Sequence, residues 1–177
     1  EIADSERDRA NVKNVCFQID DAQKLAHISS DSMDVVLNIE SAFHYPDKAA
    51  FIKEIYRVLK PGGKFLIADI LSNWTKWERN VKTLGVQRVT HFWDQKRYDD
   101  EFLKSGLVVT FREDITHQVS KGWELYHKWM PKLKRKQFFQ DVAYRIFYII
   151  NIRMNNYYLR HGQKYFVFVG QKPLSKN

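Results

Sequence analysis

Residues 34–69, DVVLNIESAFHYPDKAAFIKEIYRVLKPGGKFLIAD, predict a strand, a loop, a helix, a turn and a second strand. Residues 34–39 are apolar and β-branched, which is typical of a strand buried on both faces of a parallel sheet. From Asp47 onward, apolar residues recur at spacings of three and four, so one face of a helix is predicted to pack on the sheet. Pro61-Gly62-Gly63 ends this helix and turns the chain into a strand at residues 64–70. The stretch therefore predicts a parallel βαβ unit.

The composition fits one globular domain. The chain has 177 residues, of which 44% are hydrophobic, and this suffices for a core. The one cysteine, Cys16, lies in an apolar strand pattern, so we expect a buried thiol in a reducing compartment. The sequence shows no metal-ligand spacing and no apolar run of about 20 residues that could span a bilayer. We therefore expect a cytoplasmic protein without a metal.

Three blocks of the sequence carry a resemblance to a known family. They are NIES with HYPD at residues 38–47, RVLKPGG at residues 57–63 and IAD at residues 67–69. These blocks resemble class I S-adenosylmethionine-dependent methyltransferases, and most of all those that act on polyketides, glycolipids, sterol-like or tocopherol-like molecules. The resemblance implies an α/β fold, a Rossmann-like sheet with helices on both faces. It also implies O- or C-methylation of a small or lipid-like acceptor, with S-adenosylhomocysteine as product.

The resemblance also places the first residues within that fold. It implies that residues 1–10 end a helix and that residues 14–19 form the next strand. The glycine-rich cofactor loop and the acid that binds the ribose would then precede residue 1, so residues 1–177 would be one partial methyltransferase domain with its N-terminal strands missing. The alternative is that Glu1 is itself the ribose acid, but no strand precedes it.

Asp20-Asp21-Ala22 follows the strand predicted at residues 15–19. The resemblance implies that Asp21 accepts a hydrogen bond from the adenine amino group and that the backbone amide of Ala22 meets the ring. A carboxylate suits this role because it offers only acceptors. Asp20 is the competing candidate, and the alternative for Asp21 is an aspartate that caps the following turn.

Asn38, Ile39 and Glu40 end the next strand, where the resemblance implies contacts with the methionine end of the cofactor. Glu40 is a candidate on physical grounds too, because a charge at the carboxyl end of an apolar strand serves no evident structural purpose. The alternative is an ordinary surface carboxylate.

His44 is the candidate general base, because an imidazole titrates near neutral pH and can take the proton of the methyl acceptor. In a sugar-modifying group of the family, this histidine acts together with an acid at the end of the following strand, and Asp69 occupies that place. One departure is that Phe43 replaces the first of two adjacent histidines of that group, which puts the pair in doubt. The alternative is a His44 that packs or caps the helix after Pro46.

The second half of the chain is predicted from its pattern. Residues 98–105 form a helix that Gly106 ends, and residues 107–111 form a strand. Residues 164–170 form the last strand, which the resemblance implies is antiparallel and at the sheet edge. Residues 113–161 between them are expected to form a helical cap over a large apolar acceptor, with a helical core layer as the alternative.

The net charge of +8 comes mostly from the late segment. If the cap faces a lipid, this basic cluster could lie against anionic headgroups, as a peripheral membrane contact. Nucleic acid is disfavoured, because no nucleic-acid-binding module is recognisable. Two rival functions stay open: a non-catalytic binding or regulatory module on the same fold, and an RNA methyltransferase. The second is weakened because NIESAFHYPD stands where many base-modifying relatives have an Asn-Pro-Pro-Tyr type sequence.

Overall fold

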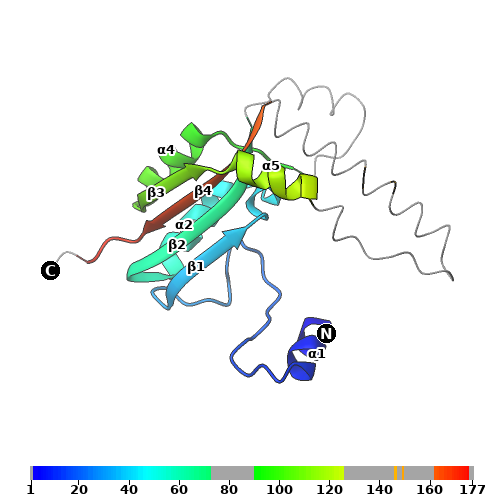
Figure 1. Ribbon diagram of the computed structural model, residues 1–177. Helices are drawn as coiled ribbons and strands as arrows, with labels where there is room; N and C mark the ends of the chain where they lie inside the picture. Colours follow the sequence, from blue (N-terminus) through cyan, green and yellow to red (C-terminus); the bar gives the residue numbers. More distant parts are fainter. Residues whose placement is uncertain (1, 73–89, 126–145, 147–148, 150–161, 176–177) are drawn as a thin grey trace.

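The computed structural model describes residues 2–72, 90–125, 146, 149 and 162–175. They form a four-stranded sheet with the strand order β1-β2-β4-β3 (Figure 1). Strands β1 and β2 are parallel, and β4 is antiparallel to both β2 and β3. The strands are β1 (Met33–Ile39), β2 (Leu59–Ser72), β3 (Val108–Asp114) and β4 (Gln163–Gln171).

The predicted βαβ unit is confirmed. Helix α2 (Lys48–Val58) connects β1 to β2, and the side chain of its N-cap, Asp47, accepts a hydrogen bond from the Ala50 N–H at 2.9 Å. The apolar face of α2 is buried through the residues whose spacing predicted the helix: Phe51, Ile52, Ile55 and Val58. The helix therefore forms because one of its faces packs on the sheet.

The turn predicted at residues 61–63 lies within strand β2. The pairing with β1 skips from Met33–Leu59 to Val35–Lys64, so the intervening residues have no partner in β1. Gly62 has a φ of 78°, a conformation that glycine adopts at little cost. Regular parallel pairing then runs from Lys64, where the sequence predicted the strand to begin.

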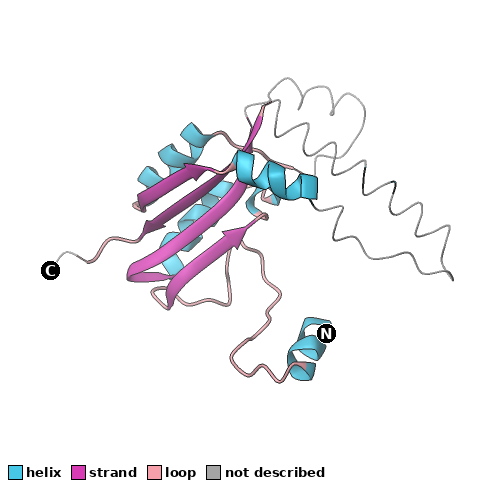
Figure 2. Cartoon of the chain, in the orientation of Figure 1, coloured by secondary structure: helices cyan, strands magenta, loops and turns pink. Residues whose placement is uncertain are grey.

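Helices cover both faces of the sheet, as predicted (Figure 2). Helix α2 and helix α4 (Gln95–Ser105) share one core cluster, which includes Phe65 and Phe168 of the sheet. Helix α5 (Thr116–Leu125) crosses the other face. On that face, the side chains of Ile115 and Val119 pack against a second, smaller core cluster. Gly106 ends α4 with a φ of 84°, as its place after the apolar pattern predicted.

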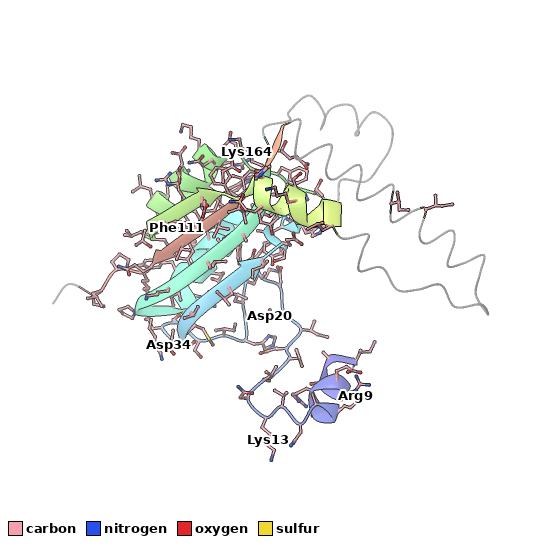
Figure 3. The ribbon with its side chains drawn as sticks, in the orientation of Figure 1. Arg9, Lys13, Asp20, Asp34, Phe111 and Lys164 are labelled. Carbon is pink, nitrogen blue, oxygen red and sulfur yellow. The ribbon has the colours of Figure 1, made fainter. Side chains whose placement is uncertain are left out.

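The strand predicted at residues 14–19 is wrong. After α1 (Ile2–Arg9), the helix expected at the start, the chain runs as an exposed loop toward β1, and Ile19 is 99% exposed. A strand needs a neighbour for its hydrogen bonds, and no described strand pairs with this segment. The expectation of a buried Cys16 is wrong for the same reason, since the thiol is exposed. Figure 3 shows Arg9 and Lys13 well apart from the sheet.

The last strand is antiparallel as expected, but its predicted place at the sheet edge is wrong. Strand β4 lies between β2 and β3, and Phe166 and Phe168 are buried beneath the helices. Strand β3 extends to Asp114 and α5 follows it, so the start of the segment predicted as a cap is a strand end and a helix. Most of the remaining predicted cap and its basic cluster lie outside the described residues. Among the described helices, none is long and apolar enough to cross a membrane.

Candidate active site

The carboxyl ends of β1 and β2 bring the predicted site residues to one edge of the sheet. Ile39 pairs with Ala68, and the Glu40 N–H donates to the Ala68 carbonyl at 2.9 Å. Asn38 and Glu40 on one strand and Asp69 on the other therefore lie on neighbouring strands at the same end. This is the edge at which parallel sheets of this kind bind ligands.

Asn38 is buried, with 7% of its surface exposed. Its Nδ2 donates to the Ser41 Oγ at 2.7 Å and to the Tyr45 hydroxyl at 3.1 Å. The Tyr45 hydroxyl in turn donates to the Ser41 Oγ at 3.1 Å. The Asn38 Oδ1 is buried and has no hydrogen-bond partner within the described part of the chain. A buried acceptor is rarely left unsatisfied, so this oxygen fits a hydrogen-bond donor of a ligand.

Glu40 adopts a left-handed backbone conformation, with a φ of 52°. A non-glycine residue in this region is strained, and such strain is concentrated at functional sites. Its exposed carboxylate acts on Tyr165 of β4: burial, and secondly the negative charge of Glu40, raise the pKa of that phenol. The Ile39 side chain is 62% exposed, so contact with a ligand through its backbone is compatible with the fold.

The two candidate aspartates, Asp20 and Asp21, lie next to each other in the loop that leads to β1, where Figure 3 labels Asp20. The Asp20 carboxylate accepts hydrogen bonds from the N–H groups of Asp21 and His27, at 2.8 and 3.1 Å. These bonds stabilise the conformation of the loop. Asp21 accepts from the Gln23 N–H at 3.0 Å, so it does cap the turn. Its side chain is still 43% exposed, and the bond from Gln23 lowers the pKa of its carboxyl. Hydrogen bonds from the loop lower the pKa of Asp20 as well, so it is the greater exposure of Asp21, 43% against 15%, that favours Asp21 as the acceptor; Ala22, the next residue, packs on the core.

The same loop is tied to the helix that follows β1. The Asp47 N–H donates to the Gln23 Oε1 at 2.7 Å. Arg57 donates to the carbonyls of Leu25 and Ile28, at 3.0 and 2.8 Å. These bonds position Asp21 relative to α2 although the loop is not a strand.

His44 is exposed at the end of the short 3-10 helix η1 (Ala42–His44). Its ring lies against Phe43, with 4.1 Å between the ring centroids. Asp69 is fully buried, and its two oxygens accept from the Phe43 N–H at 3.0 Å and from the Tyr98 hydroxyl at 2.6 Å. Among the described residues, no hydrogen bond joins Asp69 to the imidazole of His44. The structure connects the two through the backbone of Phe43.

Burial raises the pKa of Asp69, and the Tyr98 hydroxyl and the charge of Lys48 only partly oppose this shift. Lys48 and Tyr98 are themselves fully buried. Neither was predicted as a site residue: Tyr98 lies in an ordinary amphipathic helix, and Lys48 follows the N-cap of another. The sequence likewise gave no reason to select Tyr45 or Tyr165, because their roles depend on contacts between distant segments.

A hollow of about 470 Å³ opens two residues beyond Asp69. The residues that line it include Leu71 and Ser72 of β2, Phe166 of β4, and the charged residues Lys96 and Lys164. This is within the usual size of a small-molecule site, roughly 300–1,000 Å³. In the described part of the chain, no group of three or more histidine, cysteine, aspartate or glutamate residues could hold a metal ion.

Solved structures show which class of protein has this fold. Phosphoethanolamine N-methyltransferase 2 of Haemonchus contortus, solved with S-adenosyl-L-methionine, superposes with a TM-score of 0.70 at 17% identity. The match covers 95% of this chain and 40% of that one. The fold is therefore that of the class I methyltransferases, as the sequence predicted.

The sequence relatives define the family. The methyltransferase domain family matches residues 1–137, and the chain belongs to this family. A probable phthiotriol/phenolphthiotriol dimycocerosates methyltransferase 2 of Mycobacterium ulcerans is 36% identical over 85 residues, which cover 47% of this chain and 33% of the relative. Erythromycin 3''-O-methyltransferase of Saccharopolyspora erythraea is 27% identical over 159 residues, covering 83% of this chain and 51% of the relative. The chain thus spans a third to a half of these two relatives.

Proposed function

We propose that the protein transfers a methyl group from S-adenosylmethionine to a small or lipid-like acceptor, at oxygen or carbon. Two observations carry this proposal: the buried Oδ1 of Asn38 has no hydrogen-bond partner among the described residues, and the carboxylate of Glu40, two residues further on, is exposed. Both lie at the sheet edge where the fold class binds its cofactor. The methionine end of the cofactor bears an ammonium group, and two such acceptors fit its N–H donors.

The remaining cofactor contacts come from the same edge. The Asp21 carboxylate would accept from the adenine amino group, the Ala22 backbone amide would meet the ring, and Ile39 would contribute its backbone. When bound, S-adenosylmethionine supplies an electrophilic methyl group on a sulfonium. The chain's own contribution is to align the acceptor with that group and to remove the acceptor's proton.

His44 is the proposed base, because its imidazole is exposed at the end of η1 near the strand ends. It takes the proton of the acceptor hydroxyl or acidic carbon as the methyl group is transferred. Asp69 contributes indirectly. Its carboxylate accepts a hydrogen bond from the N–H of Phe43, the residue before His44, and so fixes the backbone there. His44→Ala should lower turnover about 100-fold, with little change in cofactor affinity. The exposed Lys104, at the far end of α4, provides the control, Lys104→Ala.

The acceptor class follows from two observations. The relatives named above include enzymes named for phthiotriol dimycocerosates and for erythromycin, both of them small molecules rather than polymers. The hollow beyond Asp69 combines apolar side chains with charged residues at its rim, which suits an amphipathic acceptor. We also propose that the protein is cytoplasmic and that a helical cap, which begins after β3, contacts a membrane peripherally through its basic residues.

The test is a methyl-transfer assay on the full-length protein. Cofactor carrying a tritiated methyl group is incubated with the protein and either an organic extract or total RNA of its own organism. Label in the organic extract that falls about 100-fold in His44→Ala and persists in Lys104→Ala supports the proposal. Label in RNA would favour the RNA methyltransferase, and cofactor binding without any labelled product would favour the non-catalytic module.

A further inference from the structure

Hydrogen bonds hold both backbone polar groups of Phe43, the residue before His44. The Phe43 N–H donates to Asp69 Oδ1 at 3.0 Å, and the Phe43 carbonyl accepts from the His91 N–H at 2.6 Å. The Nζ of Lys48 donates to the His91 carbonyl, and the charge of Lys48 acts on Asp69. The backbone of Phe43 is therefore held at its N–H by β2 and at its carbonyl by the segment that leads into α4.

Tyr98 completes this arrangement. Its hydroxyl donates to Asp69 Oδ2 at 2.6 Å, so both carboxylate oxygens are satisfied by the chain. The Lys48 ammonium also lies 5.7 Å from the ring centroid of Trp93. Asp69, Tyr98 and Lys48 are each 0% exposed. Buried charged and polar groups tolerate little displacement, because a lost partner cannot be replaced by water.

We propose that Lys48 and Tyr98 are positioning residues for His44. Tyr98 and Lys48 fix Asp69 and His91, and these two fix the N–H and the carbonyl of Phe43. The backbone of Phe43 in turn sets where the imidazole of His44 lies at the strand ends. This inference rests on the proposed role of His44 as base. Neither Lys48 nor Tyr98 touches the cofactor or the acceptor.

The alternative is that these buried residues serve core packing alone. Tyr98 does pack in the core, with ring contacts to Phe102 and Phe168. Tyr98→Phe retains the ring and removes only the hydroxyl, so it separates the two roles. Lys48→Met retains most of the apolar stem and removes the ammonium. The exposed Lys53 of the same helix provides the control Lys53→Met.

The experiment measures amide hydrogen exchange at Phe43 and His91, turnover and acceptor KM in the full-length protein. We expect Tyr98→Phe and Lys48→Met to speed exchange at Phe43 by about 10-fold and to lower turnover by about 10-fold, with acceptor KM and S-adenosylhomocysteine affinity within about twofold. Lys53→Met should change none of these. A loss of packing alone would lower stability but leave turnover per folded molecule unchanged.

Two results would overturn the inference. One is unchanged exchange at Phe43 in both Tyr98→Phe and Lys48→Met. The other is faster exchange with normal turnover, in an assay where His44→Ala does lower turnover. A His44→Ala variant with full turnover would instead refute the role of His44 itself, so the two failures are distinguishable.

Discussion

Asn38→Ala tests the contact on which the proposed cofactor site depends. The wild-type side chain donates two hydrogen bonds, to Ser41 and Tyr45, and presents a buried Oδ1 without a partner among the described residues. After the change, the hydroxyls of Ser41 and Tyr45 still bond to each other. The loss of stability should therefore be modest, about 1–2 kcal/mol, from two net hydrogen bonds of which the partners are partly satisfied.

The effect on ligand binding should be larger. A hydrogen bond from an ammonium group to a buried acceptor is worth about 1.5–3 kcal/mol. Its loss corresponds to a weakening of about 10- to 150-fold in Kd. The assay is calorimetric titration of the full-length Asn38→Ala protein with S-adenosylhomocysteine, with unfolding in urea measured in parallel. An affinity within about twofold of wild type, in a folded variant, would refute the assignment of the Asn38 Oδ1 to the ligand.

Three further predictions concern stability. Burial raises the pKa of Asp69 above its ordinary value of 3.8. The stability that this group contributes is therefore complete below pH 3.8 and is lost as the pH rises through the pKa of the folded state. In a plot of the urea midpoint against pH, Asp69→Asn should remove this decrease. Gly106→Ala should cost about 1–2 kcal/mol in chemical unfolding, because its φ of 84° strains other residues and an added Cβ would lie 3.2 Å from the Tyr56 ring; an unchanged midpoint would contradict this. Asp47→Ala should cost about 1 kcal/mol by removing the N-cap bond to Ala50, whereas Asp47→Ser should restore most of it.

The fold of residues 34–72 was predictable because each of its signals is local. The apolar spacing after Asp47 gives a buried helix face, and the turn at Pro61-Gly62-Gly63 lies where the pairing with β1 is interrupted. Gly106 at the end of α4 is another local signal, since its left-handed φ needs only glycine. Such features depend on residues close in sequence.

The errors concern features that depend on distant segments. Residues 14–19 have a strand-like composition, but a strand forms only beside a partner, and no described strand pairs with them. The edge position of β4 was an implication of the family resemblance. In the structure β4 pairs with both β2 and β3, and Phe166 and Phe168 are buried there.

The site was predictable only in part. Asn38, Glu40 and Asp69 lie where β1 ends and its parallel pairing with β2 stops, although β2 itself continues to Ser72. The sequence could not show that Asp69 is connected to His44 through its hydrogen bond with the Phe43 N–H. Nor could it show that the Tyr98 hydroxyl donates to the second carboxylate oxygen of Asp69. These bonds join residues 26 and 29 positions apart, which no local pattern encodes.

The most direct test of the central claim is a calorimetric titration of the full-length wild-type protein with S-adenosylhomocysteine. The proposed site predicts one cofactor molecule per chain with a micromolar dissociation constant, and weaker binding in both Asp21→Ala and Asn38→Ala. Absence of binding to the folded full-length protein would contradict the account, because a methyltransferase must hold its cofactor before any acceptor can be methylated.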